Sequence, residues 1–280
     1  MPQNIKEIHE ELFELLVAFD KICEKCDVKY SLHGGTLIGA KRYGDFIPWD
    51  DDADVTMMSW DYERVSDYLL KHPELGFRFV DSDGISCRFQ RIMLGDHPMC
   101  WIDIIEYNYI TENKLGQKLK NAILILLYAM GQSKEHVRTA TIAKHGHFKL
   151  TVYRILYYVG YLFGKKNVLK LHRNFRRHCL QGKKKFINRS NDQVSALQYM
   201  VPVEYYAKYE RVHMHGYDFM ITNNYNEVLS MPYGENWMIP PDTNEPSSLA
   251  ISWTTKGASS GETLSIPKVF ALPRINPAHE

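Results

Sequence analysis

Apolar residues recur at two different spacings along the chain, and the two spacings alternate. Apolar positions three or four residues apart run through residues 4–26, which predicts an N-terminal helix with one buried face. Asn4 followed by Glu7 is typical of the capping box that starts such a helix. Further strands are expected at 28–32, 50–58, 77–80, 85–93, 100–107, 209–212 and 215–219, and further helices at 60–71, 121–130, 151–164 and 223–230. We therefore expect an α+β fold in which helices flank a mixed sheet.

Four aspartates stand within five residues at the start of the second predicted strand. They are Asp50, Asp51, Asp52 and Asp54. Like charges this close repel one another, and burying them raises their pKa values, so a bound cation would relieve both costs. On a strand over 50–58, alternate side chains share a face, which groups Asp50, Asp52 and Asp54. This spacing suits Mg2+, which uses few carboxylates and leaves positions for water and phosphates. Mn2+ is the alternative cation.

A glycine pair precedes the acidic strand. Gly34 and Gly35 follow the first predicted strand directly. They allow backbone N–H groups to approach a phosphate, because glycine has no Cβ and adopts positive φ freely. A helix that begins at Thr36 would direct its positive N-terminal end at the same phosphate. Lys41 and Arg42 follow on this helix and are candidate contacts for the anion.

The stretch GGTLIGAKRYGDFIPWDDDADV, residues 34–55, resembles a known family. A Gly-Gly-Thr turn followed by Asp-x-Asp on the next strand is similar to the nucleotidyltransferase superfamily of the DNA polymerase β type. The longer pattern resembles the LicD family of phosphocholine and related phosphoryl-alditol transferases, to which fukutin and fukutin-related protein are similar. The positions kept from the family's motif are Gly34, Gly35, Thr36, Leu37, Gly39, Arg42, Ile47, Pro48, Trp49, Asp50, Asp51, Asp52, Asp54 and Val55. The resemblance covers residues 28–108 strongly and 199–241 moderately, and it implies a polymerase-β-like nucleotidyltransferase core.

A further aspartate, Asp103, lies in the apolar run CWIDIIEY, residues 100–107. Asp103 interrupts this predicted strand, and a carboxylate there is costly unless it is paired or metal-bound. A salt-bridged aspartate and a metal ligand are both open from the residues alone. The family's recurring Ile-Asp-Ile segment is similar to residues 102–104, and this favours the metal ligand. Arg88 and Arg91 lie on the preceding predicted strand, where Arg91 matches a basic residue of the family and is the better candidate for a phosphate contact. His33, before the glycines, is open between a substrate contact and a loop residue.

The resemblance also implies a reaction. LicD-like proteins move a phosphoryl-linked headgroup, phosphocholine or an alditol phosphate, from a CDP-activated donor to a glycan hydroxyl and release CMP. The acceptor would be a cell-surface glycan, such as lipopolysaccharide, teichoic acid or capsule, or its lipid-linked precursor. Mg2+ would be held by Asp52, Asp54 and Asp103, with Asp50 as a further ligand, and Asp103 would accept the hydroxyl proton. The expected donor contacts are Gly34, Gly35, Thr36, Arg42 and Arg91.

Two other functions are open from the residues. One is a nucleotidyltransferase that acts on a sugar or small-molecule hydroxyl. The other is a non-catalytic adaptor in glycan assembly at a membrane surface, although the retained motif argues against a decayed site.

Charge is unevenly distributed along the chain. Residues 136–191 contain 14 Lys and Arg and no Asp or Glu, so the remainder carries a net charge of −13. We therefore divide the chain into a catalytic core (1–111), a basic helical insertion (112–190), a return segment that completes the core (191–242) and a flexible tail (243–280). The insertion is expected to pack on the core, and its basic part at 165–189 to contact an anionic membrane or a phosphate-rich acceptor. No nucleic-acid motif occurs there, so nucleic acid is not expected as a partner.

The first residues and the cysteines bear on location. MPQNIKEIHEE has no apolar signal core, and the five cysteines form no even set. We expect a cytoplasmic protein that is peripheral at the inner face of the cell membrane.

Overall fold

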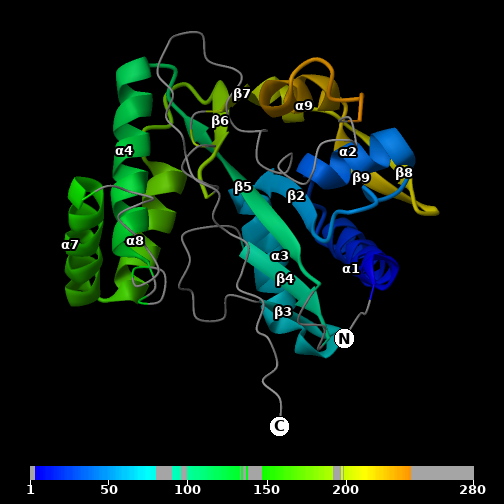
Figure 1. Ribbon diagram of the computed structural model, residues 1–280, viewed down its shortest axis with the longest axis horizontal. Coiled ribbons are helices and arrows are strands. Elements are labelled where there is room, and N and C mark those ends of the chain that lie inside the picture. Colours follow the sequence, from blue (N-terminus) through cyan, green and yellow to red (C-terminus); the bar gives the residue numbers. More distant parts are fainter. Residues whose placement is uncertain are drawn as a thin grey trace.

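A seven-stranded mixed sheet forms the centre of the molecule (Figure 1). The computed structural model describes residues 4–79, 90–95, 100–132, 134, 137, 147–191, 197 and 199–240. The main strand order is β1 (Tyr30–Leu32), β2 (Ala53–Met58), β5 (Ile102–Ile110), β4 (Gln90–Leu94) and β3 (Phe77–Phe79), while β6 (Phe186–Arg189) pairs with β5 and β7 (Met200–Pro202) with β6. β2 and β5 run parallel, and the other pairs are antiparallel. β4 and β6 therefore share the edge of β5 that β2 does not use.

Helices surround this sheet. They are α1 (Ile5–Lys25), α2 (Gly34–Tyr43), α3 (Ser59–Lys71), α4 (Lys114–Met130), α7 (His147–Phe163), α8 (Lys165–His178) and α9 (Tyr225–Tyr233), with short 3-10 turns η1 (Pro73–Leu75) and η3 (Val203–Tyr206). Asn4 caps α1 by accepting bonds from the backbone N–H groups of Lys6 and Glu7 at 2.9 and 3.1 Å, as the capping box predicts. Leu12, Leu16 and Phe19 on α1 are fully buried in the main core.

A separate hairpin extends the fold next to β1. It consists of β8 (Tyr209–Met214) and β9 (Tyr217–Thr222). The backbone N–H of Thr222 donates to Ser31 Oγ at 3.0 Å, which links β9 to β1. Arg211 on β8 binds the buried carboxylate of Asp20 on α1 at 2.7 and 2.9 Å, so the hairpin is held by a charged contact as well.

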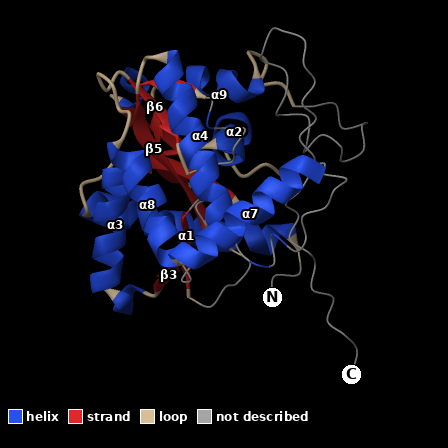
Figure 2. Cartoon of the chain, turned by 90° about the vertical axis from the view of Figure 1, so that its left-hand side faces the viewer, coloured by secondary structure: helices blue, strands red, loops and turns tan. Residues whose placement is uncertain are grey.

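The helices α4, α7 and α8 form a group at one side of the sheet, away from α1 and the hairpin (Figure 1). Figure 2 shows the molecule from that side. Leu127, Met130 and Val168 form a small apolar cluster among them. A Cβ at Gly160 would lie 2.0 Å from the Met130 carbonyl oxygen, so α7 meets the end of α4 at backbone contact distance.

Most predicted elements are present, with shifted ends. The second strand begins at Ala53 rather than Asp50, so Asp50 and Asp52 lie in the preceding segment and not on the strand. The expectation that they share a strand face with Asp54 is wrong. β6 lies within the segment predicted as a helical insertion, yet it completes the sheet. Arg88, the turn at 83–84 and the tail at 243–280 lie outside the described residues.

Candidate functional site

Two carboxylates from adjacent strands face the same side of the sheet. Asp54 on β2 and Asp103 on β5 are direct partners in the parallel register. Paired residues of neighbouring strands point to the same face, so the two side chains lie next to each other. Arg91 on β4 is in turn the register partner of Asp103. A row of three charged residues therefore crosses β4, β5 and β2.

The N-terminus of α2 lies over the acidic residues. A Cβ at Gly34 would lie 2.9 Å from Asp54 Oδ2, and a Cβ at Gly35 would lie 2.2 Å from Asp50 Oδ2. Gly34 also has φ +53°, which favours glycine. Thr36 Oγ1 accepts a bond of 2.9 Å from the Asp54 backbone N–H, which ties the helix to β2. The positive end of α2 thus faces two carboxylates, and only glycine leaves them room.

Asp50 and Asp52 lie in the segment before β2, and the pKa values of both are raised. Burial, followed by the charge of Asp51, raises the pKa of Asp50 to about 6. Burial, followed by the charges of Asp50 and Asp103, raises the pKa of Asp52 to about 7. Asp51 is exposed. Two of the predicted metal residues are thus partly buried carboxylates that are harder to ionise than free aspartates.

Arg91 neutralises Asp103. Its Nε donates to Asp103 Oδ1 at 2.6 Å, and its guanidinium lies 4.8 Å from the centre of the Trp101 ring. Asp103 is almost fully buried, which a carboxylate tolerates only with such a partner. Both readings of Asp103 from the sequence therefore have support: the residue is salt-bridged, and it also stands beside Asp54.

Arg42 was predicted to contact a phosphate, and the structure holds its guanidinium elsewhere. Nη2 donates to the carbonyl oxygen of Trp237 and, at 3.4 Å, to that of Ile239. The same loop follows α9, whose last residue Tyr233 places its hydroxyl 3.4 Å from where a Gly34 Cβ would lie. Arg42 thus fixes the return segment against α2 near the acidic residues.

Sequence reasoning missed one cation on this face. Arg189 on β6 pairs in register with Tyr107 on β5, four residues along the strand from Asp103, so its side chain points to the same side. Arg189 Nη1 donates to His33 Nε2 at 2.9 Å. Burial, followed by the charge of Arg189, lowers the pKa of His33, which is therefore neutral. Arg189 lies in the basic segment 136–191, which predicts a helical insertion. The short run Phe186–Arg189 is a local sign of a strand there.

The four aspartates meet the chemical needs of a divalent cation, but their side chains do not converge on one point. Carboxylate oxygens are the preferred ligands of Mg2+, and Asp50, Asp52, Asp54 and Asp103 supply them from two strands. In the part of the chain that the structure describes, no three His, Cys, Asp or Glu side chains are grouped closely enough to hold a metal ion. Asp103 is turned toward Arg91, and Asp50 and Asp54 toward α2. The residues fit a hard cation in chemistry and register, and side-chain rotations would be required to bind it.

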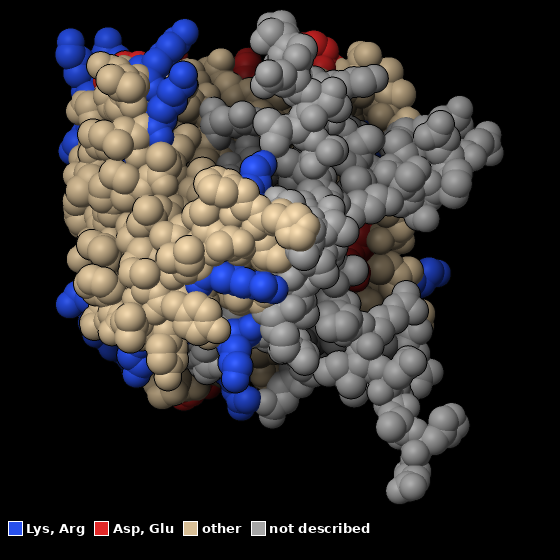
Figure 3. All heavy atoms as spheres, turned by 60° about the vertical axis from the view of Figure 1, so that its left-hand side comes forward, with Lys and Arg blue, Asp and Glu red and all other residues tan. Residues whose placement is uncertain are grey.

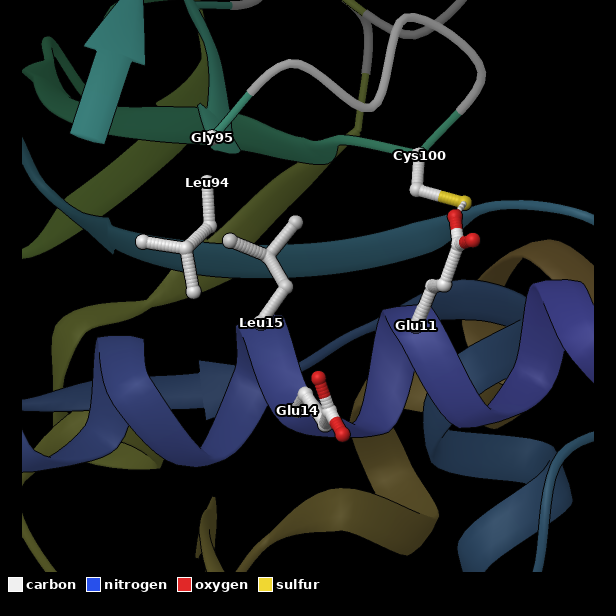
Figure 4. Close-up of a pocket in the computed structure, with 6 residues that line it drawn as sticks. All are labelled: Glu11, Glu14, Leu15, Leu94, Gly95 and Cys100. Atoms are coloured by element: carbon white, nitrogen blue, oxygen red, sulfur yellow. Dashed lines mark hydrogen bonds between the residues drawn. The ribbon is translucent and has the colours of Figure 1, made fainter. Parts of the chain in front are cut away.

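A small recess lies apart from these residues, between α1 and the β4–β5 region (Figure 4). It has a volume of about 100 Å3 and is lined by Glu11, Glu14, Leu15, Leu94, Gly95 and Cys100. The Cys100 thiol donates to Glu11 Oε2 at 3.1 Å. An acidic recess of this size does not suit a nucleotide, so the candidate site is the face that carries Asp54 and Asp103.

Part of the chain is similar to known proteins. Residues 27–121 match the family model for the LicD/FKTN/FKRP nucleotidyltransferase domain. The chain is 24% identical over 250 residues to the lipopolysaccharide cholinephosphotransferase LicD of Haemophilus influenzae, covering 82% of this chain and 90% of that protein. It is 53% identical over 34 residues to the human ribitol 5-phosphate transferase FKRP, covering 12% of this chain and 7% of that protein.

The matched segment contains α2, β2 and β5, and with them every predicted site residue. The chain is therefore a transferase enzyme that contains a nucleotidyltransferase-type domain. That domain belongs to the LicD family.

Proposed function

We propose that this enzyme transfers a phosphoryl-linked headgroup from a CDP-activated donor to a glycan hydroxyl, with release of CMP. The headgroup is phosphocholine or an alditol phosphate, and the acceptor is a cell-surface glycan or its lipid-linked precursor. The observation that carries this proposal is the register pair Asp54 and Asp103 below the glycine-rich start of α2. The core would be of the polymerase-β type. The two relatives whose names state an activity act with choline phosphate and ribitol phosphate, which supports this range of headgroups.

The acidic residues would hold Mg2+, or Mn2+ in its place. Asp54 and Asp103 are the central ligands, with Asp50 and Asp52 beside them. Such an ion supplies charge neutralisation at the donor diphosphate and the leaving CMP. Burial and the charges of neighbouring aspartates raise the pKa values of Asp50 and Asp52, and a bound cation would offset that cost.

Side chains and backbone groups of the chain would orient the donor, pair with its charge and accept a proton. The N–H groups at the start of α2 and the Thr36 hydroxyl orient donor phosphate oxygens near Asp54. Arg91 is the counter-ion of Asp103 and can contact a phosphate when Asp103 takes another partner. Asp103 accepts the proton of the attacking hydroxyl. Arg42 supports this arrangement indirectly, because it fixes the segment at 237–239 against α2.

Donor choice tests the proposal. The purified full chain is incubated with CDP-choline, CDP-ribitol, CDP-glycerol and nucleoside triphosphates, each with Mg2+ and with a chelator. We expect Mg2+-dependent CMP release from a CDP donor, and its loss in Asp54→Asn. Pyrophosphate release from a nucleoside triphosphate, with no CMP release from any CDP donor, would instead support nucleotidyl transfer.

A further inference from the structure

The outward sides of α4 and α7 carry a row of exposed apolar side chains. On α7, Phe148, Val152, Ile155 and Leu162 are exposed, and their spacings of four, three and seven residues place them on one side of the helix. Phe148 and Leu162 are 81% and 84% exposed. Leu115 and Leu119, four residues apart on α4, are exposed as well. We call these six residues the α4–α7 apolar surface.

The opposite sides of the two helices are firmly packed. Leu150, Tyr157 and Gly160 of α7 are buried, and Gly160 lies against the Met130 carbonyl of α4. Leu124 and Leu127 of α4 are buried as well. The exposed apolar residues are therefore not the unpacked core of a loose helix. They are a second apolar side on helices whose first apolar side is already used.

Positive charge surrounds this surface. The helices α4, α7 and α8 contain no Asp or Glu. Lys149 and Arg154 are exposed on α7, and Lys166 and Lys170 are exposed on α8. Figure 3 shows this side of the molecule with blue Lys and Arg side chains around a broad uncharged area and little red. The surface thus combines apolar side chains with cations and lacks acidic residues.

Part of the predicted basic contact at 165–189 is absent from this surface. Arg176 and Arg177 are buried, and both bind the fully buried carboxylate of Glu106 on β5, Arg177 at 2.9 Å. These two arginines anchor α8 to the sheet and are not available to an anionic partner. Arg173, Lys183, Lys184 and Lys185 of the predicted contact are exposed.

We propose that the α4–α7 apolar surface docks on a bilayer that contains anionic phospholipids. The apolar side chains enter the headgroup boundary, and Lys149, Arg154, Lys166 and Lys170 contact lipid phosphates. No described helix is long and apolar enough to cross a membrane. Because one side of α7 packs on α4, α7 would lie in the plane of the surface with its other side toward the lipid. A second copy of the chain fits less well, because a two-fold interface would bring these cations face to face without a carboxylate from α4, α7 or α8 between them. The docking does not depend on the proposed reaction, although it would hold the enzyme near a lipid-linked acceptor.

Vesicle sedimentation with the full chain tests this surface. We expect the protein to pellet with vesicles of phosphatidylcholine and phosphatidylglycerol at low salt, and much less with phosphatidylcholine alone. Ile155→Asp with Leu162→Asp should weaken partitioning at least about tenfold, because each buried aliphatic side chain contributes roughly that factor. Lys149→Gln with Lys166→Gln should weaken binding only to the anionic vesicles, by at least about tenfold.

Leu70→Asp is the matched control, since Leu70 is 68% exposed but lies on α3. It should bind like the unmodified chain, and circular dichroism should show all variants folded. The proposal fails if the unmodified chain stays in the supernatant with anionic vesicles. It also fails if Leu70→Asp weakens binding as much as the α7 variant. A dimer in light scattering that the α7 variant dissociates would assign the surface to a second copy instead.

Discussion

Asp103 and Glu106 stand three residues apart on β5, point to opposite faces of the sheet and have opposite charge surroundings. Glu106 is fully buried and is bound by two buried arginines, Arg176 and Arg177. Asp103 has one partly exposed arginine, Arg91, and lies beside Asp54. One face therefore has more positive than negative charge around its carboxylate, and the other has the reverse.

This difference separates an architectural ion cluster from a binding site. The cations around Glu106 come from α8, so their effect is to fasten that helix to the sheet. On the other face, Asp54 is the register partner of Asp103, and Asp50 and Asp52 precede β2, so several carboxylates lie near Arg91. Such a group is suited to a cation that arrives with the substrate. Excess acidic charge on an open sheet face is thus the informative signal, rather than the number of charged residues.

The largest expected effect is a loss of stability at Glu106, on the sheet face to which α8 is bound. Glu106→Gln leaves two buried guanidinium groups without their carboxylate, which should lower the free energy of unfolding by about 3–5 kcal/mol. Urea denaturation measures it. Glu63→Gln is the matched control, because Glu63 binds Arg177 from an exposed position, and should cost less than about 1 kcal/mol. An unchanged urea midpoint for Glu106→Gln would show that the two faces do not differ in this way.

Asp54→Asn should have the opposite profile. CMP release should fall more than about a hundredfold, because loss of a direct ligand exceeds the 10- to 100-fold effect of an outer one. The free energy of unfolding should stay equal or rise, since repulsion among the aspartates is relieved. Asp51→Asn, at the exposed aspartate, should keep most of the activity. If Asp54→Asn unfolds early and keeps its rate, the site has been assigned to the wrong face.

Substitution of two glycines of α2 should separate stability from binding in the same way. A Cβ at Gly39 would lie 2.6 Å from the backbone oxygen of Asp45, which cannot easily move, so Gly39→Ala should cost about 1–3 kcal/mol in unfolding free energy. A Cβ at Gly35 would come too close only to the Asp50 carboxylate, which can rotate, and would lie at an ordinary contact distance of 3.8 Å from Ile47 Cδ1. Gly35→Ala should therefore weaken Mg2+ binding, measured by thermal shift, with little change in stability. Equal stability losses for both would contradict this distinction.

Arg91→Lys should give the smallest effect. Lysine keeps the charge beside Asp103 but lacks the planar fork that suits a phosphate. We expect CMP release to fall about tenfold while the unfolding free energy changes by less than about 1 kcal/mol. Arg78→Lys on β3, an exposed position, is the control and should not change the rate. A rate equal to that of the unmodified chain would limit Arg91 to its pairing with Asp103.

The sequence was sufficient for the aspartates and glycines but not for the cations. The motif from Gly34 to Asp54 is local, so its residues could be placed from spacing and resemblance. The strand boundary at Ala53 could not, because a shift of three residues is within the fraying of a strand end and still moves Asp50 and Asp52 off the sheet. Arg176 and Arg177 resembled an exposed basic cluster because their partner, Glu106, is about 70 residues away in the chain. Burial of this kind is set by tertiary packing and leaves no local pattern.

The bond from Arg42 to the carbonyl of Trp237 joins residues 195 positions apart, and that from Arg189 to His33 spans 156 positions. During translation, the four site aspartates (Asp50, Asp52, Asp54 and Asp103) and the whole family-matched segment leave the ribosome before Arg189 and Trp237 are made. A nascent chain that stops after β5 thus has the candidate metal ligands but lacks Arg189 and the segment at 237–239, which bind His33 and Arg42. Cutting the gene at the limits of the matched domain would reproduce that intermediate. The early segment should gain its active form only when α9 and the loop at 234–240 have been synthesised.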